Sequence, residues 1–145
     1  MYSASIENRG DSRHYAVAAE YGFVIDTEGQ GAHPVDVLLA SLCGCIGHHV
    51  REYLRERRLE CAEFDVRSEA DSTKDGLGLS DIRVKIDLKG AALGDFHRAE
   101  LLRRAHRCRI HSALKAGSRV EMVLIGVVAT EQERAVELAL RNALQ

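Results

Sequence analysis

The fold is decided by the stretch HPVDVLLASLCGCIGHHV, residues 33–50, which continues in charged residues to Arg58. Pro34 is the only proline in the sequence, and proline is favoured in the first turn of a helix because its missing N–H has no partner there. Between residues 38 and 50 no side chain is strongly charged, so we expect a helix that is apolar almost all round and buried in the core. Its apolar residues recur at steps of three and four: Val35, Leu38, Leu39, Leu42, Ile46, Val50, Tyr53 and Leu54.

Two glycines, Gly44 and Gly47, lie inside this predicted helix. Each costs about 1 kcal/mol of helix stability relative to alanine. We interpret this cost as a sign that another backbone or a substrate approaches closely beside Cys45. It is the first indication of a functional site.

Length and composition predict one domain that spans residues 1–145, long enough to bury a real core. Hydrophobic residues make up 46% and charged residues 29%, with a formal net charge of -2, which argues against disorder and against bulk attraction to nucleic acid. The first residues lack the apolar run of a signal peptide, and no segment is long enough to cross a bilayer, so we expect a cytoplasmic protein without a membrane partner. In that compartment four cysteines indicate thiol chemistry or metal binding rather than a disulfide framework.

The segments around the central helix alternate between strand and turn patterns. Residues 2–8 and 14–26 predict an antiparallel meander of two or three strands, and a glycine-bearing loop, residues 27–32, then leads to Pro34. Residues 61–71 and 79–90 alternate apolar and polar side chains, which predicts two half-buried antiparallel strands joined by a hairpin-like linker.

The second half of the chain is mostly helical. An amphipathic helix is expected from Asp95, as N-cap, to His106, followed by a short helix that ends near Gly117. Residues 119–128 predict a final strand, and residues 130–145 an additional C-terminal helix. The apolar residues of that last helix are Val136, Leu138, Leu140 and Leu144. The order of these elements predicts an α+β architecture.

The four cysteines have different surroundings in the sequence. Cys45 lies midway along the central helix and Cys108 at the junction of two later helices, and either could be a small core residue or a reactive thiol. Cys43 lies two positions before Cys45, on roughly the opposite side of a helix, so we assign it to packing. Cys61 opens a strand without a polar cluster nearby, and we interpret it as structural.

The histidines leave a metal site open as an alternative. His48 and His49 follow Cys45 at three and four positions, so the three side chains share a helix face and could supply metal ligands. Three further histidines could complete such a set: His33, His106 and His111. The sequence has no CxxC pair and no HxxxH pair on one helix, and we therefore expect neither a metal nor another cofactor.

Two stretches, GAHPVDVLLASLCGC at residues 31–45 and AHRCRIHSAL at residues 105–114, resemble the paired signature of the OsmC/Ohr family. This family comprises osmotically inducible protein C and the organic hydroperoxide resistance proteins. The resemblance extends along most of the chain, and the segment after Thr130 is an addition to it. It implies an OsmC-like α+β fold, with a long buried central helix packed on a curved antiparallel sheet, in an intertwined homodimer.

The resemblance also implies roles for particular residues. Cys45 would be the peroxidatic cysteine and Cys108 the resolving cysteine. An arginine from the N-terminal strands, Arg9 or Arg13, would activate Cys45, held in place by Asp36.

The sequence departs from the signature at two places near these residues. The acid stands one position later than in the hydroperoxide resistance branch, because Val35 directly follows Pro34, and Arg109 follows Cys108 where many members have proline. These departures resemble the OsmC-like branch.

Two functions from different classes follow from this comparison. The first is a thiol-dependent peroxidase that reduces organic hydroperoxides and is regenerated by a small dithiol or a thioredoxin-like reductant. The alternative is a non-catalytic module that senses redox state or binds an apolar ligand.

Overall fold

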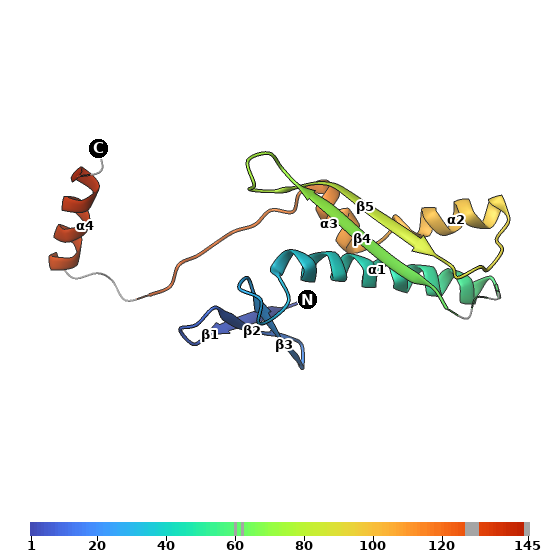
Figure 1. Cartoon of the computed structure of the whole chain (residues 1–145), viewed down its shortest axis with the longest axis horizontal. Helices are drawn as coiled ribbons and strands as arrows, with labels where there is room; N and C mark the ends of the chain where they lie inside the picture. Colours follow the sequence, from blue (N-terminus) through green and yellow to red (C-terminus); the bar gives the residue numbers. More distant parts are fainter. Residues whose placement is uncertain (60, 62, 127–130, 144–145) are drawn as a thin grey trace.

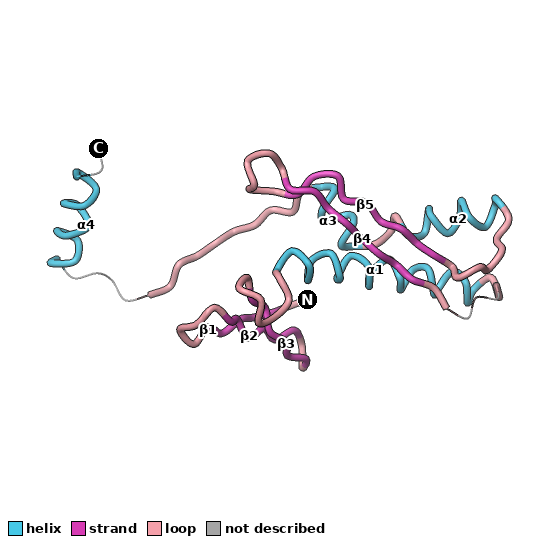
Figure 2. Tube along the Cα trace, in the orientation of Figure 1, coloured by secondary structure: helices cyan, strands magenta, loops and turns pink. Residues whose placement is uncertain are grey.

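The computed structural model describes residues 1–59, 61, 63–126 and 131–143. Figures 1 and 2 show how the helices and strands are arranged. In chain order the elements are β1 (Ala4–Asn8), β2 (Arg13–Ala18), β3 (Tyr21–Asp26), α1 (Pro34–Glu56), β4 (Asp65–Ser72), β5 (Leu79–Asp87), α2 (Asp95–Ala105), α3 (Arg109–Ala116) and α4 (Glu131–Ala143). All strand pairs are antiparallel, and the predicted α+β class is confirmed.

The predicted N-terminal meander is present, with the strand order β1-β2-β3. Its last residue, Asp26, is buried and accepts hydrogen bonds from the backbone N–H groups of Glu28 and Gln30 and from the Ser12 hydroxyl. The loop therefore folds back on itself, and the Ala32 N–H donates to the Val24 carbonyl at 3.2 Å. This arrangement delivers the chain to the start of α1.

Helix α1 begins at Pro34, as predicted. His33 is the N-cap, and its Nδ1 accepts a hydrogen bond from the Val35 N–H at 3.2 Å. Five α1 side chains are buried in the hydrophobic core: Leu42, Ile46, Val50, Tyr53 and Leu54. Within the described part of this single chain, α1 contacts β4, α2 and α3, and its buried residues recur at steps of three and four along one face. The sequence predicts a helix buried almost all round, so burial in one chain is less than expected.

Strands β4 and β5 form the predicted antiparallel hairpin, with Asp65 opposite Asp87. The first strand starts at Asp65, four residues later than expected, and Ala62 lies outside the described residues. The hairpin crosses over α1 (Figure 1), where a Cβ at Gly47 would contact Phe64 and Val66 at 3.6 and 3.8 Å. Gly47 thus faces the hairpin, while nothing described lies within 4 Å of a Cβ at Gly44.

Helices α2 and α3 lie where the sequence predicted them. The N-cap of α2 is Gly94, and Asp95 is the first helical residue, so the expected Asp95 cap is wrong by one position. The N-cap of α3 is Cys108, whose sulfur accepts a hydrogen bond from the His111 N–H at 3.4 Å. This use of Cys108 positions the start of α3 beside α1.

The chain beyond α3 differs from the prediction of a final strand over residues 119–128. Residues 118–126 belong to neither a helix nor a strand, and 127 and 128 lie outside the described residues. A strand requires a hydrogen-bonded neighbour, and the described part of this single chain places none beside the segment. We expect one curved antiparallel sheet, whereas the described residues form two antiparallel sheets, of three and two strands.

A helix is present near the C-terminus, where Figure 1 shows α4 apart from the other elements. Residues 130, 144 and 145 of the predicted C-terminal segment lie outside the described residues. No helix among the described residues is long and apolar enough to span a membrane.

Candidate active site

Two cysteines from distant parts of the sequence meet where α1 passes the start of α3. Cys45 is partly buried in the middle of α1, and Cys108 is fully buried at the N-cap of α3. Both belong to the contiguous hydrophobic core, Cys108 as a member and Cys45 packed against it. The thiol of Cys108 and the backbone N–H groups of Arg109 and Ile110 lie close enough to the Cys45 sulfur to shift its pKa.

The surroundings of Cys45 favour its thiolate form. Burial, the largest single influence, raises the pKa of Cys45. Hydrogen bonds from the Cys108 thiol and from the backbone N–H groups of Ile110 and Arg109, with the positive charge of Arg109, outweigh burial and leave the pKa below its ordinary value. The first N–H groups of a helix have no intrahelical partners and carry partial positive charge, which explains why they stabilise an anion here.

The pKa of Cys108 is shifted in the opposite direction. Burial raises it first, and the hydrogen bond to Cys45 raises it further, while the His111 N–H opposes both. The two cysteines are therefore unequal, and we call them a polarised pair: Cys45 loses its proton more readily and is the better nucleophile, while Cys108 keeps its proton and donates a hydrogen bond to Cys45. This asymmetry is what a nucleophile with an adjacent second thiol requires.

Arg109 is a site residue that the sequence reasoning did not select. It is the first residue of α3, and both its backbone N–H and its guanidinium lower the pKa of Cys45. The guanidinium donates to the Tyr2 hydroxyl and lies 5.8 Å from the centre of the Tyr2 ring. The available signal was the positive residue directly after Cys108, which we noted only as a departure from the OsmC/Ohr signature.

The other two cysteines face away from this pair. Cys43 donates to the Ser68 hydroxyl of β4 at 3.1 Å, and Ser68 donates to the Leu39 carbonyl. Cys61 donates to the Glu63 carbonyl at 3.2 Å. Cys43 and Cys45 thus lie on different sides of α1, in agreement with their two-residue spacing.

The structure places Arg9 on the turn that follows β1 and Arg13 at the first residue of β2. Arg9 forms an ion pair with Glu7 at 3.1 Å, and Arg13 pairs with Asp11 at 2.5 Å. Asp36 is exposed in the first turn of α1. It precedes Cys45 by nine residues, about 14 Å along a helix axis, so the roles expected for these three residues stay predictions.

The histidines near the cysteine pair do not gather into one group. The rings of His48 and His49 are 5.5 Å apart, and those of His106 and His111 are 5.0 Å apart, each pair in edge-to-face contact. Among the described residues no three His, Cys, Asp or Glu side chains are placed to hold one metal ion. Burial lowers the pKa of His49, the His48 ring adds to this, and the nearby Arg104 and Arg107 lower it further.

Comparison of the sequence with protein families gives a match over residues 27–123 to the family described as OsmC-like protein. The match covers α1, the β4–β5 hairpin, α2 and α3, and it includes both cysteines of the candidate site. It ends before α4. No curated protein matches the sequence.

Solved structures with the same fold were also found. An OsmC-like protein from Mycoplasma pneumoniae superposes with a TM-score of 0.69 at 16% identity, covering 81% of this chain and 89% of that chain. The organic hydroperoxide resistance protein OhrB of Bacillus subtilis gives 0.54 at 18% identity, covering 81% and 92%. An organic hydroperoxide resistance protein from Elizabethkingia anophelis gives 0.58 at 14% identity, covering 81% and 89%. At these identities the similarity establishes the fold.

Proposed function

Because the chain belongs to the OsmC-like protein family, we propose that it is a thiol-dependent peroxidase that reduces organic hydroperoxides. The observation that carries the proposal is the polarised pair of cysteines at the start of α3, in which Cys45 has a lowered and Cys108 a raised pKa. The organic hydroperoxide resistance proteins that share the fold support the same substrate class.

The first step oxidises Cys45. Its thiolate attacks the terminal peroxide oxygen, so that an S–O bond forms while the O–O bond breaks. The substrate leaves as an alkoxide that takes up a proton and becomes an alcohol, and Cys45 becomes a sulfenic acid. The helix N–H groups that lower the pKa of Cys45 increase the fraction of the attacking sulfur that is ionised.

The second step links the two cysteines. The Cys108 thiol loses its proton and attacks the Cys45 sulfur, an S–S bond forms, and hydroxide leaves and is protonated to water. Reduction back to two thiols requires two electrons, which we assign to a small dithiol or a thioredoxin-like protein. The free cysteines and the need for such a reductant support a cytoplasmic location.

We further propose that the active form is an intertwined homodimer. The segment of residues 118–126 exposes apolar side chains that include Leu124 at 99% and Ile125 at 91% of their full accessible area. It has the composition of a strand, and a second chain could supply the missing neighbour. The exposed face of α1 around Gly44 would then also be covered. In such a dimer, Arg9 or Arg13, with Asp36, could approach the partner's cysteine pair.

A peroxidase assay on the reduced protein tests the proposed reaction. Cumene hydroperoxide at one equivalent should produce a Cys45–Cys108 disulfide that dithiothreitol reverses, as judged by mass spectrometry. Cys45→Ser should abolish peroxide consumption. Cys108→Ser should consume about two equivalents, one to form the Cys45 sulfenic acid and one to form the sulfinic acid, and then stop because the sulfinic acid is not reduced by a dithiol. Cys43→Ser is the matched control, since Cys43 faces β4, and should turn over normally. If the wild-type protein consumes no peroxide, the redox-sensing or ligand-binding alternative replaces this proposal.

Light scattering after size-exclusion chromatography tests the dimer. The expected mass is about twice the 16.0 kDa of the chain. Leu124→Asp should weaken the association, because the side chain is fully exposed in one chain but would be buried by a partner. A stable monomer at micromolar concentration contradicts the dimer while leaving the thiol chemistry open.

A further inference from the structure

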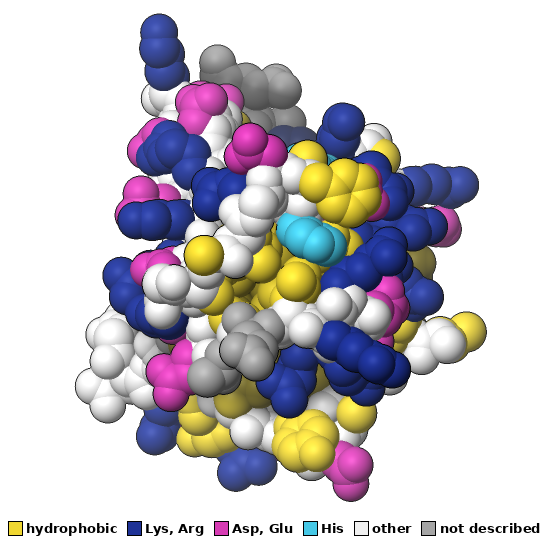
Figure 3. Space-filling view, turned by 90° about the vertical axis from the view of Figure 1, so that its right-hand side faces the viewer, with side chains coloured by type: hydrophobic (Ala, Val, Ile, Leu, Met, Phe, Trp, Pro, Cys, Tyr) yellow, Lys and Arg dark blue, Asp and Glu magenta, His cyan; other side chains and the backbone are white. Residues whose placement is uncertain are grey.

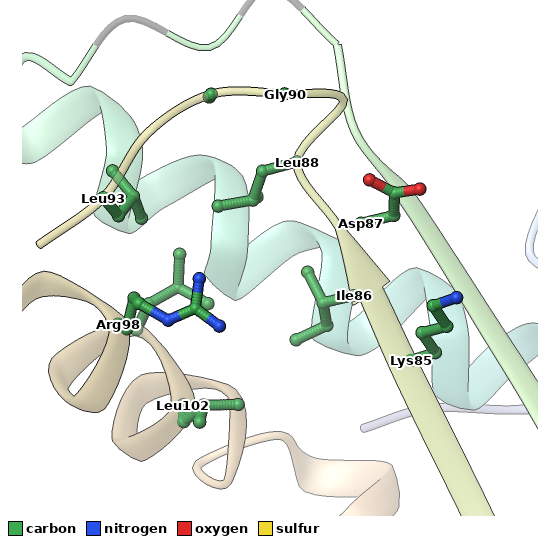
Figure 4. A pocket seen from close by; sticks show the side chains of 10 residues that line it. Lys85, Ile86, Asp87, Leu88, Gly90, Leu93, Arg98 and Leu102 are labelled. Atoms are coloured by element: carbon green, nitrogen blue, oxygen red, sulfur yellow. The ribbon is translucent and has the colours of Figure 1, made fainter. Parts of the chain in front are cut away.

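A cavity lies away from the cysteine pair, between the end of β5 and the middle of α2 (Figure 4). Its volume is about 430 Å³, within the range of small-molecule sites in proteins. Most of its wall is apolar and comes from β5, from the turn after β5 and from α2. The apolar residues of the wall are Ile86, Leu88, Ala91, Leu93, Leu101 and Leu102.

The rim of the cavity is formed by a tight turn after β5. The Ala91 N–H donates to the Leu88 carbonyl at 3.1 Å, and the Asp87 carboxylate accepts a hydrogen bond from the Lys89 N–H at 3.0 Å. Gly90 lies in the left-handed region, with φ of 83°, which closes the turn. The rim is thus held by its own hydrogen bonds before any ligand binds.

Arg98 is one of three charged residues that line the cavity, with Lys85 and Asp87, and it is the one that comes from α2. Figure 4 shows its guanidinium between α2 and β5, directed toward Ile86. Successive strand residues point to opposite faces, so Lys85 and Asp87 belong to the other face of β5 from Ile86. Within the described ranges no carboxylate pairs with Arg98. The Arg98 guanidinium therefore lies beside the apolar wall of the cavity, and its N–H groups are available to a ligand.

The surface around this end of the molecule is also suited to an anionic ligand with an apolar part. Figure 3 shows hydrophobic side chains exposed in the centre of this face, with Lys and Arg side chains on both sides of them. Leu102, at the cavity wall, and Phe96, on the first turn of α2, are both exposed.

We propose that this cavity binds an amphiphilic monocarboxylate, with its carboxylate on Arg98 and its alkyl chain along Ile86, Leu93 and Leu102. A guanidinium presents two parallel N–H donors that match a planar carboxylate. The charged residues that line the cavity are Lys85, Asp87 and Arg98, whose formal charges sum to +1, so one negative charge is balanced, and a phosphate dianion would require more cations. The apolar walls explain why an alkyl chain belongs to the ligand.

The proposed site is separate from the cysteine pair and does not depend on peroxidase activity. Leu101 contributes to the cavity wall and to the same hydrophobic core as Cys108, but neither cysteine lines the cavity. Binding can therefore be measured on a Cys45→Ser protein, which has no reactive thiol to oxidise. A failure of this proposal and a failure of the peroxidase proposal then give different results.

Isothermal titration of the Cys45→Ser protein with decanoate, below its micelle concentration, tests the site. We expect saturable binding of one decanoate per chain. Arg98→Gln should weaken decanoate binding about ten-fold or more, because a hydrogen-bonded charge pair is lost. Binding of decanol, which has the same chain without the charge, should be unchanged by Arg98→Gln.

Two further variants make the test specific. Arg103→Gln is the matched control, since Arg103 lies on the same helix but pairs with Glu100 and does not line the cavity. It should bind decanoate as the parent protein does. Ala91→Phe fills the cavity from its rim and should weaken decanoate and decanol alike. The proposal would be overturned if decanoate did not bind saturably. It would also be overturned if Arg98→Gln and Arg103→Gln changed decanoate binding equally, because decanoate bound to the exposed segment 118–126 would not depend on Arg98.

Discussion

The backbone N–H of Arg109 can be removed by one substitution, because proline has no N–H. Cys108 already has φ of -56° and ψ of 130°, the extended conformation that a following proline requires. Position 109 is also the first in α3, where proline is favoured. Arg109→Pro should therefore fold with α3 in place and remove both the N–H and the charge from Cys45. Arg109→Gln removes the charge alone and is the matched control.

The expected effect follows from the strength of the lost hydrogen bond. A hydrogen bond to a charged group contributes about 1.5–3 kcal/mol, or about one to two powers of ten in the thiolate population at a pH below the pKa. The less stabilised thiolate gains about half as many powers of ten in nucleophilicity. Loss of the N–H alone should thus lower the alkylation rate of Cys45 about three- to ten-fold, and Arg109→Pro, which also loses the charge, should fall at least that far. An exposed charge contributes at most about 1 kcal/mol, so Arg109→Gln should lose no more than about three-fold.

The assay is iodoacetamide labelling of the native, reduced protein at pH 6, followed by mass spectrometry of the peptide that carries Cys45. A Cys43→Ser background leaves one cysteine in that peptide. Circular dichroism verifies that both variants keep their helices. If Arg109→Pro reacts as fast as Arg109→Gln, the N–H does not stabilise the thiolate, and our account of how α3 activates Cys45 is refuted.

Three further predictions concern the fold that holds the site. Asp26 has a pKa below its ordinary value of 3.8, chiefly because the backbone N–H of Glu28 donates a hydrogen bond to its carboxylate. The stability that this carboxylate adds is present above pH 3.8 and is lost as the pH falls further. Asp26→Asn should therefore lower the melting temperature more at pH 6 than at pH 3. Leu42→Ala removes a buried side chain from α1 and should cost about 2–5 kcal/mol in urea unfolding. Gly31→Ala should destabilise the chain in the same assay, because its Cβ would lie 2.7 Å from the Val24 carbonyl oxygen, whereas Gly44→Ala, with nothing described within 4 Å, should not.

The local elements were predictable because each depends on residues close in sequence. Pro34 fixed the start of α1, since its ring suits the first helical turn. The alternation in residues 79–90 gave β5, because a half-buried strand needs that period. The cap of α2 was misplaced by one residue, since Gly94 and Asp95 are both common at this position and only the backbone distinguishes them.

The final strand could not be verified in the same way, because pairing is a property of two strands. Residues 119–126 have the β-branched and aliphatic composition of a strand, and this pattern led to the prediction. In the described part of one chain the segment has no neighbour, so the backbone hydrogen bonds that define a strand do not form. A sequence pattern predicts the tendency to pair, and the partner must come from the assembly.

For the candidate site, the resemblance selected Cys45 and Cys108 and implied that Arg9 or Arg13 activates Cys45, which stays a prediction. We expected a cation from the N-terminal strands, whereas the influences on Cys45 in this chain come from the start of α3. Backbone N–H groups leave no mark in a sequence, because every residue except proline has one. The relevant signal in the sequence was that Arg109, and not proline, follows Cys108. Arg109 gives the first position of α3 a backbone N–H and a positive charge, and both lower the pKa of Cys45.

Cys108 takes part in two interactions, one with the His111 N–H and one with Cys45, and disulfide formation in the proposed cycle affects both. In the reduced protein its sulfur caps α3 by accepting the His111 N–H, and its thiol donates to Cys45. A disulfide with Cys45 removes the thiol proton and fixes the Cys108 sulfur by a covalent bond, so that the sulfur no longer adjusts to the His111 N–H; this weakens a cap of the kind that contributes about 1 kcal/mol. The start of α3 is therefore less firmly held in the oxidised protein than in the reduced one. Since α3 covers the cysteine pair, loosening it would expose the disulfide at the stage when a reductant has to reach it.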